Sequence, residues 1–186
     1  FEGAYVTTSN DRLASQLKAA GNFGFHEGRD AKLLGINAKL NELHAALALS
    51  NLPYLDELKA GNAARFEAYQ KEFAGMKGID FADYSHSPGN YSLVLMQIGA
   101  EWPFSRSDML KLLNAEMALA RPYYSPTLYE GDPEFRTSDR DKFPISDAIH
   151  RRFMQMPTGE MTSVEDISSI ATLFAFLHSN SAAIAE

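Results

Sequence analysis

Several features that define common protein classes are missing from this sequence. It contains no cysteine, so it has neither a disulfide framework nor a cysteine-based zinc site. None of its apolar runs approaches the ~20 residues of a membrane-spanning helix, and we expect no membrane association. Lysine and arginine number 17 against 24 acidic residues, giving a formal net charge of −7. This balance argues against a nucleic-acid groove, and the lack of cysteine fits a cytoplasmic protein.

Short catalytic motifs are also absent. The sequence has no G-x-S-x-G, Walker or G-x-G-x-x-G pattern. None of its five histidines stands at a metal-ligand spacing from another histidine or a carboxylate. We therefore predict no self-contained active site and no metal site.

What is present indicates a globular core. Apolar residues make up 45% of the 186 residues, which suits one domain, or one small domain with part of another. The chain begins on Phe1 without a methionine, and residues 4–8 (AYVTT) have the composition of a strand. We therefore expect it to be a fragment of a longer protein.

The apolar spacing of the first 75 residues predicts helices. A helix is expected over about 11–19 behind a polar cap at 9–11, followed by a glycine-broken loop over 21–32. From Leu40 the apolar residues keep helical spacing for some 35 residues. Pro53 interrupts this run, with Asn51 as the expected new N-cap.

The remaining residues predict a compact α/β unit. Strands are expected over 90–98, 117–124 and 153–157, and a short helix over 146–153. Ser105 or Ser107 is expected to cap a helix that runs to about Asn114. Thr162 and Glu165 predict a capping box for a final helix over 162–179.

The start of the long helical stretch is the first candidate ligand site. Gly35 permits close backbone approach, Asn37 is expected at or near the helix N-cap, and Lys39 adds a positive charge. A helix start of this kind favours an anion such as phosphate. Asparagine also commonly caps its own helix, and the residues alone leave both interpretations open.

The second candidate is the segment 121–129, RPYYSPTLY. Arg121, Tyr123, Tyr124 and Tyr129 cluster there, and two prolines stiffen the loop. Tyrosine rings and an arginine suit a sugar or phosphate ligand. A packed loop with interfacial tyrosines is the alternative.

Six blocks of sequence resemble one family, in the family's order and over nearly the whole chain. The blocks are FEGAYVTTSNDRLA, NFG, GINAKLNELHAALAL, NYSLVLMQI, ARPYYSP and QMPTGEMTSVEDI. They are similar to the C-terminal half of the DegT/DnrJ/EryC1/StrS aminotransferases. The resemblance implies a pyridoxal 5'-phosphate enzyme that transfers an amino group, from a donor such as glutamate, to a keto sugar linked to a nucleotide.

The resemblance also implies the fold class. The chain would be the α/β C-terminal part of an aspartate-aminotransferase-like fold, with a long helix followed by a small α+β domain. That domain would hold a mostly antiparallel sheet with helices on one side. Residues 1–35 would be a remnant of the cofactor-binding large domain, 36–75 an interdomain helical segment, and 76–186 the small domain.

Four residues stand at or near binding positions of the family, and two of them depart from the family's usual residue. Asn37 matches the asparagine that reaches across a homodimer to the cofactor phosphate of the other subunit. Lys39 stands where the family usually has arginine, which implies a place near the cofactor or the substrate diphosphate. Tyr124 belongs to the Y-Y-x-P loop near the substrate, and Tyr129 stands where a histidine usually follows.

The family's catalytic lysine has no match in this chain. The resemblance places the lysine that forms the Schiff base just upstream of Phe1, so no catalytic residue is assigned here. Because transamination needs that amine, we expect the chain alone to be inactive. The alternative hypothesis is a non-catalytic module that uses the apolar helical stripe for dimerisation or partner binding.

Overall fold

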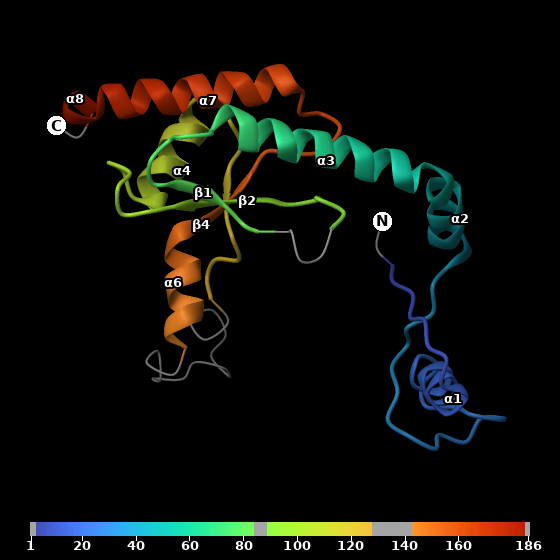
Figure 1. Cartoon of the computed structure of the whole chain (residues 1–186). Helices are drawn as coiled ribbons and strands as arrows, with labels where there is room; N and C mark the ends of the chain where they lie inside the picture. The colour runs from blue at the N-terminus through green and yellow to red at the C-terminus, as the bar shows by residue number, and fades with distance from the viewer. Residues whose placement is uncertain (1–2, 84–88, 128–142, 185–186) are drawn as a thin grey trace. The chain divides into compact units, whose positions relative to one another are not determined.

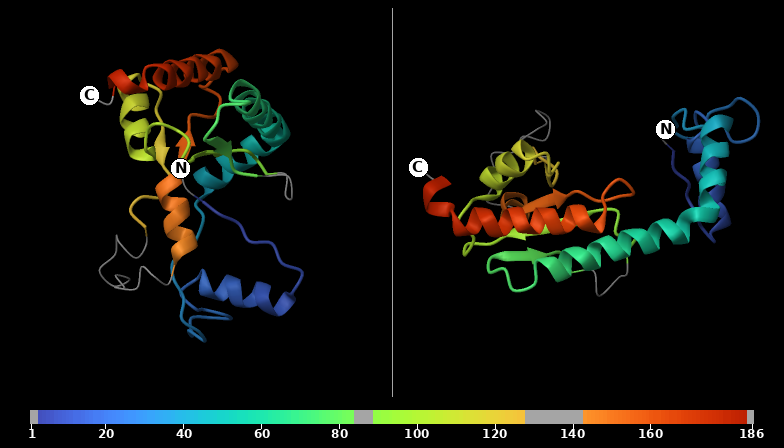
Figure 2. Two further views of the ribbon diagram at one scale, coloured as in Figure 1. Left: turned by 60° about the vertical axis from the view of Figure 1, so that its left-hand side comes forward. Right: turned by 90° about the horizontal axis from the view of Figure 1, so that it is seen from above.

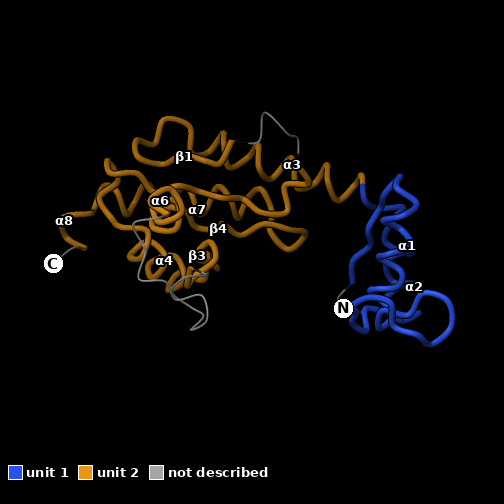
Figure 3. Tube along the Cα trace, turned by 90° about the horizontal axis from the view of Figure 1, so that it is seen from below, with its two compact units in different colours: residues 1–55 blue, residues 56–186 orange. Residues whose placement is uncertain are grey.

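The chain divides into two compact units, residues 1–55 and 56–186 (Figure 3). A computed structural model describes residues 3–83, 89–127 and 143–184. The first unit contains the helices α1 (Asp11–Ala20) and α2 (Glu42–Asn51) and a short 3₁₀ turn, η1 (Leu52–Tyr54). No helix in the described part of the chain is long and apolar enough to cross a membrane.

The first helix forms as predicted, but the strand before it does not. The side chain of Asn10 caps α1 by accepting a hydrogen bond from the N–H of Leu13 at 3.0 Å. Residues 4–8 have no regular secondary structure, and Tyr5 is 83% exposed. The prediction of a strand there is wrong, because a strand is stable only when a neighbouring strand pairs with its backbone.

The helix start predicted at Asn37 lies at a different residue. Helix α2 begins at Glu42, and the side chain of Asn41 caps it by accepting from the N–H of His44 at 2.9 Å. Asn37 is four residues before this cap and pairs instead with Asn22 in an antiparallel bridge. Residue 37 therefore lies in a paired segment before the helix and not at its N-cap.

The interruption at Pro53 is confirmed. The turn η1 separates α2 from α3 (Leu55–Glu72), with the proline in its first positions. Asn51 does not act as an N-cap, contrary to the prediction. It keeps helical backbone angles as the last residue of α2 and makes no capping hydrogen bond.

The second unit is a small antiparallel sheet with helices, shown in Figures 1 and 2. Its strands follow the order β1-β2-β4-β3, and every neighbouring pair is antiparallel. This confirms the predicted fold class. Its elements are α3, β1 (Ile79–Phe81), β2 (Val94–Ile98), α4 (Arg106–Ala115), β3 (Arg121–Pro122), α6 (Pro144–Arg152), β4 (Phe153–Met156), α7 (Val164–Ser179) and α8 (Ser181–Ile184).

One face of this sheet carries the core. Along β2 the residues Val94, Met96 and Ile98 are buried, while the residues between them are half-buried. This alternation is the period-2 pattern of a strand with one covered face. Helices α3, α4 and α7 supply the other side of the core, and Figure 1 shows α3 and α7 on the same side of the sheet. The most deeply buried helix residues are Tyr69, Met109, Leu113, Ile167 and Phe174.

Two side chains of α3 tie this helix to the turn between β4 and α7. The hydroxyl of Tyr69 donates to the carbonyl of Pro157 at 2.8 Å, and Nε of Arg65 donates to the carbonyl of Thr162 at 2.7 Å. Burial and the nearby charge of Asp166 raise the pKa of Tyr69 well above its ordinary value, so its hydroxyl stays protonated and keeps donating.

The helix caps of this unit are close to the predictions. Ser105 caps α4 as expected. The capping box of α7 is formed by Ser163 and Asp166, one residue after the predicted pair. Thr162 is buried, whereas Ser163, which forms the cap, is exposed.

The strands are shorter than the sequence indicates. Of the predicted strand 117–124, only Arg121–Pro122 pairs with β4, and β2 begins at Val94 rather than at residue 90. Strand β1, a three-residue edge strand, was not predicted. Such short strands are defined by their partners, since three residues carry too little of the alternating pattern.

Replacing Ser163 by alanine should lower the free energy of unfolding of the second unit by about 1 kcal/mol, because an N-cap serine satisfies an otherwise unpaired helix N–H. Chemical denaturation measures this change. Ser169→Ala is the matched control. Its hydroxyl donates to the carbonyl of Glu165 within the same helix, so its removal should have little effect. Equal losses from the two variants would contradict the assigned cap.

The effect should also depend on pH. Backbone and side-chain hydrogen bonds from Ser163 lower the pKa of Asp166 below its usual value. A carboxylate with a lowered folded-state pKa stabilises the fold above its unfolded pKa, and this stabilisation is lost as pH falls through the folded pKa. The advantage of the wild type over Ser163→Ala should therefore shrink below about pH 4.

Candidate functional site

The candidate site around Asn37 is built by two segments of the first unit that pair with each other. Beyond α1 the chain turns tightly, with the N–H of Gly24 donating back to the carbonyl of Ala19 at 2.8 Å. The turn is then joined to residues 36–38 by three backbone hydrogen bonds. Phe23 donates to Ile36 at 3.0 Å, Ile36 to Ala20 at 2.8 Å, and Ala38 to Gly21 at 2.9 Å.

Two glycines make this pairing possible. Gly24 has φ +83°, a left-handed conformation that glycine adopts at no steric cost. Gly35 passes directly against it. A Cβ at position 35 would overlap the backbone nitrogen of Gly24 and lie 2.7 Å from the carbonyl oxygen of Ala20. The close approach expected at Gly35 is therefore an approach of backbone to backbone.

This arrangement brings Asn37 and Lys39 together on the surface. The ammonium of Lys39 lies 3.4 Å from Oδ1 of Asn37 and 4.2 Å from the centre of the Phe23 ring. Both polar side chains are exposed. Because Oδ1 accepts from the lysine, the amide N–H donors of Asn37 are left to bind a ligand.

These two donors fit a phosphate group. Phosphate oxygens accept hydrogen bonds from an ammonium and from an amide N–H, and here the two donors lie side by side. No carboxylate among the described residues forms an ion pair with Lys39. The residues present are therefore suited to the phosphate of pyridoxal 5'-phosphate or of a nucleotide. The charge comes from Lys39, and not from the end of a helix.

The second candidate lies in the other unit. Strand β3 ends in a loop where the rings of Tyr123 and Tyr124 stand 4.8 Å apart and nearly perpendicular. Tyr124 is exposed and has φ +45°, so its ring is presented to solvent by an unusual backbone conformation. Arg121 is exposed on the strand itself. Tyr129 lies outside the described residues.

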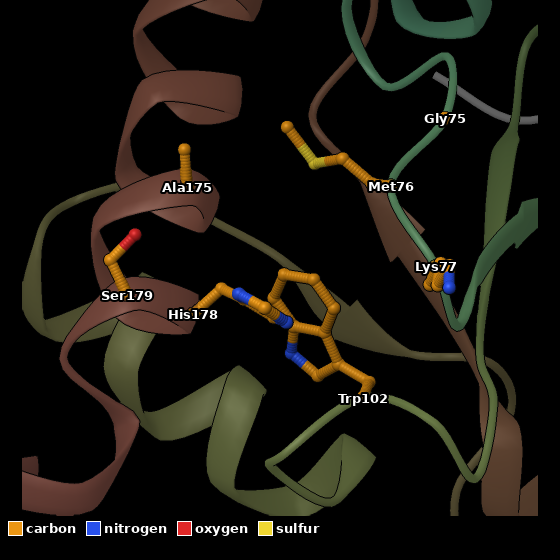
Figure 4. A pocket seen from close by; sticks show the side chains of 7 residues that line it. All are labelled: Gly75, Met76, Lys77, Trp102, Ala175, His178 and Ser179. Atoms are coloured by element: carbon orange, nitrogen blue, oxygen red, sulfur yellow. The ribbon is translucent and has the colours of Figure 1, made fainter.

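The second unit also contains a cavity of about 370 Å³, shown in Figure 4. The indole of Trp102 and the ring of His178 form part of its wall, with centroids 5.2 Å apart. None of the residues predicted to bind a ligand lines it. Within the described ranges, no three acidic or histidine side chains gather as metal ligands.

Replacing Gly35 by alanine should break the pairing that holds Asn37, because the added methyl group has no space beside Gly24. Hydrogen exchange should then become faster at the amides of Phe23, Ile36 and Ala38, which measures the pairing directly.

Gly21→Ala is the matched control, since a Cβ there would meet its nearest atom at an ordinary 3.4 Å. Its exchange pattern should resemble that of the wild type. Unchanged protection in Gly35→Ala would show that the crossing does not position the site.

Comparison with known proteins identifies relatives over nearly the whole chain. Residues 1–175 match the model of the DegT/DnrJ/EryC1/StrS aminotransferase family. A dTDP-4-amino-4,6-dideoxy-D-glucose transaminase of Shigella dysenteriae is 23% identical over 73% of this chain and 36% of its own length. A dTDP-3-amino-3,6-dideoxy-alpha-D-galactopyranose transaminase of Aneurinibacillus thermoaerophilus is 23% identical over 90% of this chain and 45% of its own length.

The fold agrees with these matches. The crystal structure of DesI in the presence of its TDP-sugar product superposes with a TM-score of 0.85 and 27% identity, covering 96% of this chain and 46% of that one. The PLP form of Spr1654 from Streptococcus pneumoniae superposes with a TM-score of 0.77 at 15% identity, covering 95% of this chain and 46% of that one. The chain thus spans less than half the length of the curated relatives described above.

Proposed function

Because the chain belongs to the DegT/DnrJ/EryC1/StrS aminotransferase family, we propose that the complete protein is a sugar aminotransferase. Pyridoxal 5'-phosphate is the cofactor of such an enzyme. The reaction would move an amino group, from a donor such as glutamate, to a keto sugar carried by a nucleotide. Two relatives named as transaminases of dTDP-linked amino sugars support this substrate class.

The paired donors of Asn37 and Lys39 are the observation that carries the proposal. The amide of Asn37 would donate to the cofactor phosphate of the partner subunit in a homodimer. Lys39, 3.4 Å away, would bind the diphosphate of the sugar nucleotide. The bound cofactor supplies the electron sink for the chemistry, and these two residues hold and orient phosphate groups.

The tyrosine loop after β3 would shape the sugar pocket. Tyr124 would offer a ring face and a hydroxyl to the sugar, and Tyr129 is proposed as a further substrate contact. The exposure of Tyr124 supports this role, since a packed loop would bury that ring.

The division of the chain follows the same proposal. Residues 1–35 would belong to the cofactor-binding large domain, residues 36–75 to an interdomain helical segment, and residues 76–186 to the small domain. No lysine of this chain matches the family's catalytic lysine, so this chain by itself would not transaminate. A cytoplasmic location fits the proposed biosynthetic role.

One observation favours a second candidate function, dimerisation or partner binding without catalysis. Leu43 and Leu49 of α2 are each 67% exposed, although the helix is apolar on most sides. A helix of this composition is normally covered, so α2 would be buried by a second protein surface. The same surface of α2 could form the dimer interface of the proposed enzyme, because a site shared between subunits requires a dimer.

Replacing Asn37 by alanine in the full-length protein should weaken the binding of pyridoxal 5'-phosphate about tenfold or more, because a hydrogen bond to a charged group is lost. Binding of pyridoxal, which has no phosphate, should change little. Titration of both ligands by fluorescence measures the difference.

Asn51→Ala serves as the control for this substitution. Asn51 is exposed at the end of α2 and makes no capping bond. It should bind both ligands as the wild type does. Equal affinity of Asn37→Ala and wild type for the phosphorylated ligand would refute the proposed role of Asn37.

The chain of 186 residues should form no defined covalent adduct with the cofactor. Reduction with borohydride after adding pyridoxal 5'-phosphate, followed by mass spectrometry, should reveal no single preferred lysine. The full-length protein should show one modified lysine that lies outside this chain. Stoichiometric modification of one lysine within the chain would contradict the assignment.

A further inference from the structure

The ammonium of Lys39 stands over the face of the Phe23 ring, 4.2 Å from its centre. This is well inside the roughly 6 Å at which an aromatic face attracts a cation. We propose that Phe23 is a positioning residue that holds the Lys39 ammonium beside Asn37 for a phosphate oxyanion. The inference rests on the proposed function, in which these two residues bind phosphate groups.

Core packing does not account for Phe23. The residue is 45% exposed, and within the described part of the chain its ring lies 5.9 Å from that of Phe25 in a tilted arrangement. Its backbone has φ +58°, a left-handed conformation that costs free energy in any residue with a Cβ. A strained backbone that carries a half-exposed ring is typical of a functional position.

The backbone pairing positions the Phe23 ring. The N–H of Phe23 donates to Ile36 at 3.0 Å, and the neighbouring residues Asn22 and Asn37 form a bridge. The backbone that carries the ring is therefore held at a fixed position relative to Asn37. Lys39 lies two residues after Asn37, just beyond the paired segment. Its flexible side chain therefore contacts the ring instead of moving freely in solvent.

A ring suits this position better than a carboxylate would. An acidic partner would neutralise the ammonium and compete with a bound anion. The ring attracts the ammonium but leaves its positive charge intact. Among the described residues, the recorded contacts of this ammonium are the Phe23 ring and Oδ1 of Asn37, both uncharged.

Two sources could supply the oxyanion, namely the cofactor phosphate and the diphosphate of the nucleotide sugar. Binding experiments on the full-length protein distinguish them, with pyridoxal 5'-phosphate and dTDP as the two probes. Lys39→Gln should weaken one of these two ligands. Phe23→Leu, which removes the ring face but keeps an apolar side chain, should weaken that same ligand about 2- to 5-fold, as expected for an exposed cation–π contact.

Phe23→Trp should restore binding, because it retains an aromatic face for the ammonium. Phe25→Leu is the matched control, since it removes an aromatic ring from the same turn without removing the ring under Lys39. It should bind both ligands as the wild type does. Loss of affinity in Phe23→Trp or Phe25→Leu equal to that in Phe23→Leu would overturn the inference and indicate a general effect on the turn.

A second measurement does not depend on ligand binding. In the wild-type chain, the ε-methylene protons of Lys39 should be shifted upfield by the ring current of Phe23 in the NMR spectrum. Phe23→Leu should abolish this shift, and Phe25→Leu should preserve it. A random-coil shift for these protons in the wild type would overturn the inference even if Phe23→Leu fails to fold.

The two proposals fail in different ways. If Lys39→Gln weakens a ligand and Phe23→Leu does not, the role of Phe23 is wrong, while the phosphate site stands. If Lys39→Gln changes neither affinity, the assignment of Lys39 to a phosphate is wrong, and the role of Phe23 is wrong with it.

Discussion

The candidate site depends on the close passage of two backbone segments at Gly24 and Gly35. Their contact leaves no room for a Cβ at position 35, and three hydrogen bonds lock residues 20–23 to residues 36–38. Everything polar in the site follows from this passage. Asn37 lies within the paired segment, Lys39 lies just after it, and the ring that contacts the lysine lies on the opposite segment.

The second unit depends on helices that cover one face of its sheet. Its four-stranded sheet has short strands, which by themselves bury little. The apolar side chains of α3, α4 and α7 complete the core on one face. Arg65 and Tyr69 of α3 donate hydrogen bonds to two backbone carbonyls of the turn before α7. These bonds connect α3 to the turn and give partners to those carbonyls. The loop with Tyr124 extends from a two-residue strand at the edge of this sheet.

The chemistry proposed for the complete protein is divided among parts of it. This chain offers hydrogen-bond donors, a positive charge and tyrosine rings, which are suited to binding and orienting a ligand. It offers no residue that matches the catalytic lysine of the family. A site shared between subunits, as proposed, would explain why the sequence contains no short catalytic motif. In the proposed enzyme, Asn37 and Lys39 would bind phosphate groups at a site completed by another subunit, so no local sequence pattern would contain both partners.

The sequence by itself determined the family, the two main helical regions, the break at Pro53 and the buried alternation of β2. These depend on local spacing and on ordered blocks, which survive without knowledge of the fold. It also indicated Asn37 and Lys39 as candidate ligand residues, but it placed Asn37 at or near a helix N-cap. The cap of α2 is Asn41, and Asn37 pairs with Asn22 in a bridge that lies before the helix.

Only the tertiary structure decided which segments pair. The strand predicted over 4–8 and most of that over 117–124 do not form, while β1 forms with few local signals. In each case the outcome depends on a partner distant in the sequence, because a strand gains its hydrogen bonds only from a neighbour. Phe23 was missed for the same reason. Its contact with Lys39 spans sixteen positions, and it arises only after the backbone has crossed at Gly35.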